Sequence, residues 1–581
     1  MECDKLLSFL IRANNLLKHD FIHSTNKQYE TNDLSVDDIS ALTVTQCHVD
    51  FRALISSPFD FEKELDISAL FPHASPVINR YFKLNTPLLL VNTLEWETAV
   101  EVIEQVKPAT TKVTSLLNYN QQDLFGRVEI DAEKQIQYRQ GLLQQSDHAV
   151  FLLNISPLLV SPELWFQLKA FMQRGFLRIN DAVNADKIRQ VLPDLPTIMS
   201  PTKIILMASR SQLAELMQID PEYTQVPSLF CELATQLPVT QQNCRLIAHY
   251  CQDFCCQSNI QLIDDNALIT LLAFLVKACQ HQQKILFSPQ VIKELIVYAN
   301  VLTKQSTLNR ETLLAVINET ELAQSLPRQH SEQGILEEQI KLQLSGEVVG
   351  QINGLSVVEL LGYPCEFGEV FRISASDMIG DGELIDVERK VDLAGNIHAK
   401  SLLIVQGYIN HLFNHVSTFP YSCHLVFEQS YQESDGDSAS LATLSAALSC
   451  YAQHPIKQDV FVTGSLDQQG NVLAIGGINQ KIEAVTRLFE IGLLAGPVTV
   501  VIPASNVINL TLNNQTLAFI EAGKIIVKPV QHCQQAFPIL MGKTLPQLLT
   551  MINHRVEKTL KSEAEETGES LITRVLRYFS R

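Results

Sequence analysis

Residues 435–440 (DGDSAS) and 476–481 (GGINQK) carry the strongest chemical pattern in this sequence. The first segment follows residues 421–427, an apolar run typical of a buried strand. It precedes residues 440–451, in which apolar side chains recur at helical spacing. Ser438 is therefore predicted where a loop meets the first turn of a helix, beside backbone N–H groups that the helix leaves unpaired. Such groups can stabilise a developing oxyanion.

The second segment predicts a lysine in the first turn of another helix, residues 479–490, after a glycine pair that permits a tight strand-to-helix turn. A serine nucleophile needs a base, and a desolvated lysine with a lowered pKa can be that base. Considered one at a time, Ser438 and Lys481 also fit a helix cap and a solvated helix lysine. The sequence has no Gly-x-Ser-x-Gly, and neither His398 nor His424 stands in such a setting, so no Ser/His/Asp arrangement competes.

Composition limits the possible partners. The chain has 581 residues, 46% of them apolar and 18% charged, which indicates a globular protein of several domains. A formal net charge of −19 argues against nucleic acid, because phosphate binding depends on clustered Lys and Arg. The best candidate for a membrane helix, residues 267–276, has only about half the required length and is interpreted as a buried helix.

Targeting and cysteine patterns favour a cytoplasmic protein with reduced thiols. The N-terminus (MECDKLLSFLIRANN) lacks a basic segment followed by an apolar core. Cys251, Cys255 and Cys256 lie close together, but no second ligand pair follows at zinc-like spacing, so they are interpreted as one side of a buried helix.

The order of predicted elements divides the chain into five segments. Strands at 86–92, 149–155 and 203–207 alternate with helices, which is typical of a parallel α/β domain. Helices follow at 241–257, 265–280, 288–302 and 309–322, then a polar stretch at 327–333 interpreted as a linker, and then a second set of strands and helices. The segments are an N-terminal region (1–75), an α/β domain (76–210), a helical domain (211–328), a second α/β domain (340–543) and a charged C-terminal tail (544–581) with a helix predicted at 571–579.

The strand–loop–helix at the start of the first α/β domain lacks the residues that bind a phosphate. The connecting residues 92–98 (NTLEWET) contain no glycine and no lysine, and Glu95 and Glu97 would repel a phosphate. A magnesium-binding strand normally ends in carboxylates, whereas the strand at 149–155 leads into Asn154, Ile155 and Ser156.

At the serine and lysine segments the chain resembles the Lon-type serine proteases, most closely the B-type branch, whose serine motif reads Gly-Asp-Ser-Ala-Ser. The resemblance covers roughly residues 340–543 and places Ser438 as the nucleophile and Lys481 as the general base. The matching segments are residues 350–355 (GQINGL), 398–401 (HAKS), 463–465 (TGS), 470–473 (GNVL), 475–477 (IGG), 481–484 (KIEA) and 501–506 (VIPASN).

The N-terminal portion resembles the AAA-type ATPase module of bacterial Lon-like proteins, with residues 124–129 (LFGRVE) among the similar segments. The resemblance implies a multidomain α/β protein: a degenerate AAA-type α/β module with a helical lid, then a Lon-type α/β proteolytic domain. The family binds ATP and magnesium, but both nucleotide motifs are degraded here, so the residues predict no cofactor and no metal. The resemblance also implies polypeptide substrates and a homo-oligomer, a ring of six by the family's habit.

Three further residues are expected to support the pair. Thr463 would hydrogen-bond Lys481 and fix its orientation, and backbone N–H groups near Asp437 and Ser438 would hold the oxyanion. Asp435 would either shape the loop or pair with Lys481 in a resting state. Two other function classes stay open: a non-proteolytic chaperone-like or regulatory scaffold, and a DNA-repair protein with a Lon-like domain, which the acidity disfavours.

Overall fold

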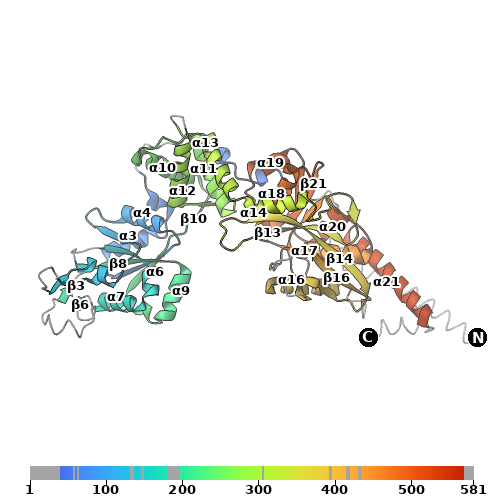
Figure 1. The fold of residues 1–581 in the computed structure, drawn as a ribbon, viewed down its shortest axis with the longest axis horizontal. Coiled ribbons are helices and arrows are strands. Elements are labelled where there is room, and N and C mark those ends of the chain that lie inside the picture. The colour runs from blue at the N-terminus through green and yellow to red at the C-terminus, as the bar shows by residue number, and fades with distance from the viewer. Residues whose placement is uncertain are drawn as a thin grey trace, which may run out of the picture. The chain divides into compact units, whose positions relative to one another are not determined.

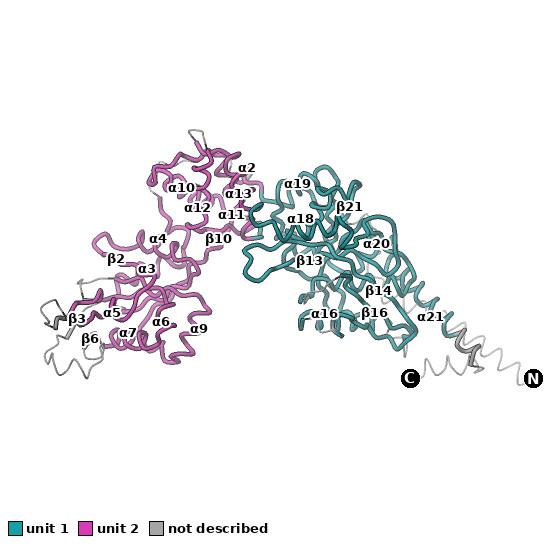
Figure 2. The backbone as a smooth tube through the Cα atoms, viewed as in Figure 1, with its two compact units in different colours: residues 1–49, 280–282, 321–581 teal, residues 50–279, 283–320 magenta. Residues whose placement is uncertain are grey.

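The chain folds into two compact units (Figure 2). Unit 1 comprises residues 1–49, 280–282 and 321–581, and unit 2 comprises residues 50–279 and 283–320. The computed structural model describes residues 39–55, 59, 61, 65–130, 136–144, 150–174, 176–178, 197–199, 202–303, 307–390, 395–413, 419–429 and 435–567. About half of the predicted N-terminal region and the helix predicted at 571–579 lie outside these residues.

Unit 2 is built on a five-stranded sheet in the order β2-β5-β8-β1-β9, and every neighbouring pair is parallel (Figure 1). The central strand β1 is buried along its whole length because parallel sheets carry helices on both faces. The parallel α/β prediction is therefore confirmed. The strands are β1 (Leu88–Asn92), β2 (Val113–Leu116), β5 (Val150–Asn154), β8 (Lys203–Ala208) and β9 (Ser228–Glu232), and the connecting helices include α3 (Ser75–Lys83), α4 (Trp96–Val106), α5 (Gln121–Phe125), α6 (Ser156–Val160), α7 (Pro162–Arg174) and α9 (Arg210–Ile219).

The second half of unit 2 is helical, and its four helices begin and end within one residue of the predicted bounds. The helical part starts later than the predicted boundary at 211, because strand β9 still belongs to the α/β sheet. It contains α10 (Gln241–Gln257), α11 (Asp265–Cys279), α12 (Pro289–Leu302) and α13 (Arg310–Ala323), with the short pair β10 (Gln236–Pro238) and β11 (Lys284–Leu286). Side chains cap two of these helices: Thr240 accepts from the third residue of α10, and Ser288 does the same for α12. Because capping residues mark where a helix begins, the predicted and observed starts of these two helices agree closely.

Unit 1 holds a seven-stranded mixed sheet in the order β15-β16-β14-β13-β18-β21-β22. Its strands are β13 (Gln351–Val358), β14 (Phe367–Ile379), β15 (Leu384–Asp386), β16 (Tyr421–Glu428), β18 (Val460–Val462), β21 (Val498–Pro503) and β22 (Ile525–Val530), with small pairs formed by β12 (Glu347–Val348), β17 (Ile456–Lys457), β19 (Ser465–Leu466) and β20 (Val472–Leu473). The helices are α14 (Leu326–Leu336), α15 (Val387–Lys390), α16 (Asn396–Leu412), α17 (Ser440–Ala452), α18 (Ile478–Glu490), α19 (Asn514–Glu521), α20 (Cys533–Met541) and α21 (Leu545–Thr567).

The sheet of unit 1 separates two apolar cores, because successive strand residues point to opposite faces. On β18, Val460 and Val462 belong to one core and Phe461 to the other. The first core also contains α16, α17, α20 and the buried half of α21, and the second contains α18 and α19. The helices that carry the two candidate catalytic groups, α17 and α18, therefore pack on opposite faces of one sheet.

The structure differs from the sequence-based expectation at three places. The stretch at 327–333 is not a linker but part of α14, whose first turn holds Pro327, a residue that suits a helix start as well as a turn. The sequence predicts separate strands at 346–352 and 355–360, whereas in the structure a single strand, β13, runs through Asn353 and Gly354. A Cβ at Gly354 would lie 2.7 Å from the Phe371 ring, so this glycine makes room for an aromatic side chain. The helix predicted from Pro157 is broken before Pro162 into α6 and α7.

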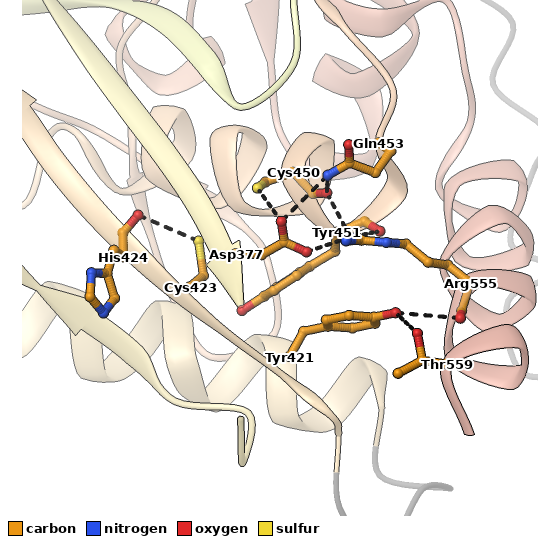
Figure 3. A network of polar contacts seen from close by, with 9 residues as sticks. All are labelled: Asp377, Tyr421, Cys423, His424, Cys450, Tyr451, Gln453, Arg555 and Thr559. Carbon is orange, nitrogen blue, oxygen red and sulfur yellow. Dashed lines mark hydrogen bonds and ion pairs between the residues drawn. The ribbon is translucent and has the colours of Figure 1, made fainter. Parts of the chain in front are cut away.

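Helix α21 is tied to the core of unit 1 by Arg555 (Figure 3). The Arg555 guanidinium pairs with the Asp377 carboxylate and lies 4.3 Å from the centroid of the Tyr421 ring. It also donates to the carbonyls of Cys450 and Tyr451 over 3.2 Å each, at the carboxyl end of α17, where a cation complements the helix dipole. The segment predicted as a charged tail thus begins with a helix that packs on unit 1. Through Arg555 this helix contacts the carboxyl end of α17.

Candidate active site

The serine and lysine predicted from the sequence are in contact. Ser438 lies in the turn before α17, and Lys481 lies in the first turn of α18. The Lys481 Nζ donates a hydrogen bond to the Ser438 Oγ over 2.8 Å. At this distance a neutral amine can accept the hydroxyl proton as the oxygen attacks a carbonyl.

The strand end after β18 holds the turn that carries Ser438. The Gly464 amide donates to the Ser438 carbonyl over 2.7 Å, and the Thr463 hydroxyl donates to the same carbonyl over 3.2 Å. The Leu441 amide in turn donates to the Gly464 carbonyl over 3.0 Å. Lys481 also donates to the Thr463 Oγ1 over 3.3 Å, as expected of a residue that orients the lysine. These contacts fix both members of the pair against one strand end.

Burial prepares Lys481 to act as a base. Lys481 is only 3% exposed. This desolvation lowers the pKa of its amine, and the nearby Asp437 carboxylate partly opposes the shift, so that the pKa falls from 10.5 to about 8. A substantial fraction of such an amine is neutral at mildly alkaline pH. The general base predicted from the resemblance is thus supported by its environment.

Two glycines determine where α18 begins. Gly477, the residue before the helix, has φ +62°, and a Cβ there would lie 2.3 Å from the Val357 side chain. A Cβ at Gly368 of β14 would lie 2.0 Å from the carbonyl oxygen of Gln480. The first turn of α18 therefore packs directly against the backbone of the sheet, which places the next residue, Lys481, at a defined depth.

The start of α17 offers hydrogen-bond donors for an oxyanion. The Ser440 amide donates to the Asp437 carbonyl over 3.1 Å and closes the turn. The amides of Ser438 and Ala439 have no acceptor among the residues that the structure describes. Unpaired amides at the first turn of a helix are suited to bind a developing negative charge.

The two aspartates of the serine segment have different partners. The Asp435 carboxylate accepts hydrogen bonds from the amides of Ile397 and His398, over 2.9 and 3.2 Å, and so caps α16. The Asp437 carboxylate accepts from the Ser465 hydroxyl over 2.7 Å. In this structure Asp435 is thus engaged at the start of α16, whereas Asp437 is the acid that raises the pKa of Lys481.

Sequence reasoning gave no role to Ser465 or to a buried cluster under α16. Ser465 lies in the segment 463–465 (TGS), which the sequence placed close to the lysine region, but no sequence signal connects it with Asp437. In the cluster, His398 Nε2 lies 3.3 Å from Asp386 Oδ2, and Glu388 accepts from the Phe427 amide over 2.8 Å. Burial and the hydrogen bond with Asp386 raise the pKa of Glu388 to about 7. Two sets of contacts therefore hold the first turn of α16: the His398 side chain contacts Asp386, and the Asp435 carboxylate caps the helix.

Comparison with known proteins identifies the family. Residues 331–536 match a family model described as the Lon protease (S16) C-terminal proteolytic domain, and residues 109–232 match one described as a LonB-like AAA domain. A Haemophilus influenzae protein named "Putative Lon protease homolog" is 33% identical over 462 residues, which cover 77% of this chain and 76% of the relative. The chain belongs to the Lon protease family.

Other Lon relatives match over different lengths. A protein of the same name from Escherichia coli K12 is 32% identical over 433 residues, covering 73% of this chain and 72% of the relative. The archaeal Lon protease of Methanocaldococcus jannaschii is 40% identical over 117 residues, which cover 20% of this chain and 16% of the relative. Among the described residues of this Lon chain, no helix has both the length and the apolarity to cross a bilayer.

In the AAA-type module of this Lon chain, the loop that follows β1 does not offer a phosphate site. In such modules a glycine-rich loop with a lysine follows the first strand and wraps the phosphates with its backbone. Here β1 leads through Thr93, Leu94 and Glu95 into α4, and the Glu95 carboxylate accepts a hydrogen bond from the Thr98 hydroxyl over 3.1 Å. Burial raises the pKa of Glu95, so the loop presents a partly buried acid where a phosphate would need donors.

Ion pairs occupy the helix that follows this loop. Lys293 of α12 donates to Glu97 and Glu101 of α4, over 3.0 and 2.7 Å, and the Tyr250 hydroxyl donates to Glu101 over 2.7 Å. The lysine that lies near this helix is thus held by two carboxylates. Its pKa is raised chiefly by the hydrogen bonds with Glu101 and Glu97, against the effect of burial.

The strand that would hold magnesium ends in an amide. Asn154 is the last residue of β5, and its side-chain oxygen accepts from the Ser156 amide over 2.8 Å, which starts α6. A neutral amide committed to a helix start is a poor replacement for the carboxylates that hold Mg²⁺. The residues present therefore do not fit ATP and magnesium.

Proposed function

We propose that this Lon-family protein is a serine endopeptidase that cleaves polypeptides with Ser438 as nucleophile and Lys481 as general base. The observation that carries the proposal is the 2.8 Å contact between the Ser438 hydroxyl and a lysine that is 3% exposed. Membership of the Lon family supports a peptidase, and the lowered pKa of Lys481 supports its assignment as the base.

The reaction has two stages. Neutral Lys481 accepts the Ser438 proton while the Ser438 oxygen attacks the carbonyl carbon of the scissile peptide bond. The amides of Ser438 and Ala439 bind the oxyanion, and the protonated lysine returns a proton to the leaving amine. Water, deprotonated by Lys481, then attacks the acyl-enzyme and releases Ser438. Thr463 is a positioning residue that keeps the lysine amine directed at the hydroxyl.

Replacing Ser438 by alanine tests this assignment. Hydrolysis of casein and of a fluorogenic peptide should fall to background, because Ser438 supplies the attacking oxygen. The other hydroxyl in contact with Lys481, that of Thr463, donates its proton to the Ser438 carbonyl. Ser445→Ala is the matched control, since Ser445 lies in α17, the helix that follows Ser438, and its hydroxyl donates to the Leu441 carbonyl, 2.7 Å away. Undiminished hydrolysis by Ser438→Ala would reject the dyad.

We further propose that this peptidase works without ATP, forms a homo-oligomer and resides in the cytoplasm. The poor fit of the nucleotide loop and of Asn154 to ATP and magnesium supports the first point. The free thiols at the described cysteines fit a reducing compartment. A ring of six copies is the assembly that the family resemblance implies, and light scattering of the purified protein gives the number directly.

The alternative is a non-proteolytic scaffold that retains the Lon fold, and the misfit of the nucleotide site favours it. A serine-directed phosphonate separates the two functions. A peptidase should be labelled at Ser438, as located by mass spectrometry, and labelling should be lost in Ser438→Ala. A scaffold with a solvated, protonated lysine should not react.

A further inference from the structure

The Ser465 hydroxyl is committed to the acid next to the nucleophile. Ser465 is 2% exposed and begins β19, directly after the strand end that holds the Ser438 turn. Its Oγ donates to Asp437 Oδ2 over 2.7 Å, a short and charge-assisted hydrogen bond. A buried hydroxyl with this single side-chain acceptor has a defined orientation, and so has the carboxylate that it holds.

The position of the Asp437 carboxylate matters because it determines how strongly this acid interacts with the Lys481 amine. Asp437 directly precedes Ser438, and it is the one charge that raises the pKa of Lys481. The Lys481 amine makes its two hydrogen bonds to hydroxyls, those of Ser438 and Thr463, and so meets Asp437 only through space. Direct contact would form an ion pair, keep the amine protonated and draw it away from Ser438.

We propose that Ser465 is a positioning residue that holds the Asp437 carboxylate out of contact with the Lys481 amine and so keeps the amine free to serve Ser438. This role rests on the proposed peptidase function. It adds to the reacting pair a third residue, Ser465, which sets the separation between the Lys481 amine and the Asp437 carboxylate.

The other charged groups around α18 do not perturb Lys481. On α18 itself, Glu483 accepts from the Asn513 amide, while Arg487 and Glu490 interact with each other and with Glu332. On the elements packed against α18, the charged residues are Glu369, Arg372 and Asp377 of β14 and Glu521 of α19, and none of them contributes to the shift at Lys481. Asp435 is engaged at the start of α16. Among the residues that the structure describes, Asp437 is therefore the charge to which a change in the pH profile of the base is assigned.

Loss of the Ser465 hydroxyl should release the carboxylate towards the lysine. The midpoint of the acidic limb in the pH profile of kcat/KM should then rise by about one pH unit, since an opposite charge in contact favours the charged amine by about that much or more. At pH 7 this is about a tenfold loss, whereas the rate at the alkaline plateau should change little. Asp437→Asn should move the midpoint the other way.

The experiment compares pH profiles of kcat/KM for the full-length wild type, Ser465→Ala, Asp437→Asn and the double variant. If Ser465 acts through the carboxylate, the double variant should show the midpoint of Asp437→Asn alone. Ser465→Thr restores a hydroxyl and should return the midpoint to the wild-type value. Thermal melting of each variant establishes that it is folded, and Ser465→Cys, a weaker donor of similar size, replaces Ser465→Ala if the latter does not fold.

The outcomes separate this role from the peptidase assignment. If the wild type neither hydrolyses casein nor reacts at Ser438 with the phosphonate, the proposed function fails whatever the variants do. If the wild type is active, an unchanged midpoint in Ser465→Ala overturns the positioning role. A uniform loss of rate at every pH, or a double variant that keeps the midpoint of Ser465→Ala, overturns it as well.

Discussion

At the scale of single residues, the buried amine of Lys481 sets the pH dependence of the reaction. Only the neutral amine can accept the Ser438 proton, so the rate should rise with pH, about tenfold per unit, until it levels near the pKa of about 8. The kcat/KM for a neutral fluorogenic peptide, measured from pH 6 to 10, shows this limb. A rate that still rises about tenfold per unit at pH 10 would indicate a solvated lysine and contradict the assignment.

The same burial should make Lys481 costly for stability. The pKa of the amine is about 8 when folded and about 10.5 when unfolded, so below pH 8 the difference destabilises the fold by about 3 kcal/mol. Lys481→Met removes this cost and loses the hydrogen bonds to Ser438 and Thr463, for a net gain of about 1–2 kcal/mol. Calorimetry should show an inactive protein whose Tm for unit 1 is about 2–8 °C higher at pH 7.

The pH dependence of that gain provides its own control. Because the unfolded state binds more protons than the folded state between pH 8 and 10.5, the wild type gains stability as pH rises through this window. The Tm advantage of Lys481→Met should therefore shrink towards pH 10.5. An advantage that is the same at pH 7 and pH 10 would show that packing, and not charge, is its origin.

At the scale of elements, the depth at which α18 packs on β14 is set by Gly368. A methyl group there would lie 2.0 Å from the Gln480 carbonyl and 2.9 Å from the Lys481 amide, so Gly368→Ala must push the first turn of α18 outwards. We expect destabilisation of about 1–3 kcal/mol. Displacement of the base should lower kcat/KM on the order of a hundredfold. Peptide hydrolysis and the Tm of unit 1 measure the two effects.

Gly407→Ala is the matched control, because it adds the same methyl group to a helix of the same unit. Nothing lies within 4 Å of a Cβ at Gly407, which is inside α16. The substitution should leave hydrolysis unchanged and stabilise the helix by about 0.5–1 kcal/mol. Equal effects of both alanines would show that the close approach at Gly368 does not position Lys481.

At the scale of the whole molecule, the AAA-type module should be indifferent to nucleotide. A ligand that binds only the folded state raises its Tm, by an amount that grows with ligand concentration. With 5 mM ATP and magnesium, on the order of common assay conditions, we expect no Tm shift in unit 2 and no change in peptide hydrolysis. Lys293→Ala should lower the Tm of unit 2, because it leaves Glu97 and Glu101 without their cation. An ATP-dependent shift in either protein would contradict the misfit of the loop.

Local chemistry was more predictable from the sequence than long-range contacts. Ser438 and Lys481 could be paired because small residues, glycines and helix starts mark both segments, and each prediction needed only a few neighbours in the chain. The partner of Asp435 could not be chosen, since its contacts with Ile397 and His398 join segments far apart in sequence. The interpretation of the polar stretch at 327–333 as a linker is wrong, because polar residues and a proline suit a helix start as well as a turn, and only packing decides between them.

Helix α17 has no solvent-facing side: all of its residues from Ser440 to Ala452 are buried. A helix without an exposed face cannot fray into water while the surrounding core stays packed. Its amide hydrogens should therefore exchange with deuterium only when unit 1 opens globally, and they should be among the last of the chain to do so. Heat inactivation and unfolding of unit 1 should then follow the same time course, with no folded but inactive species between them.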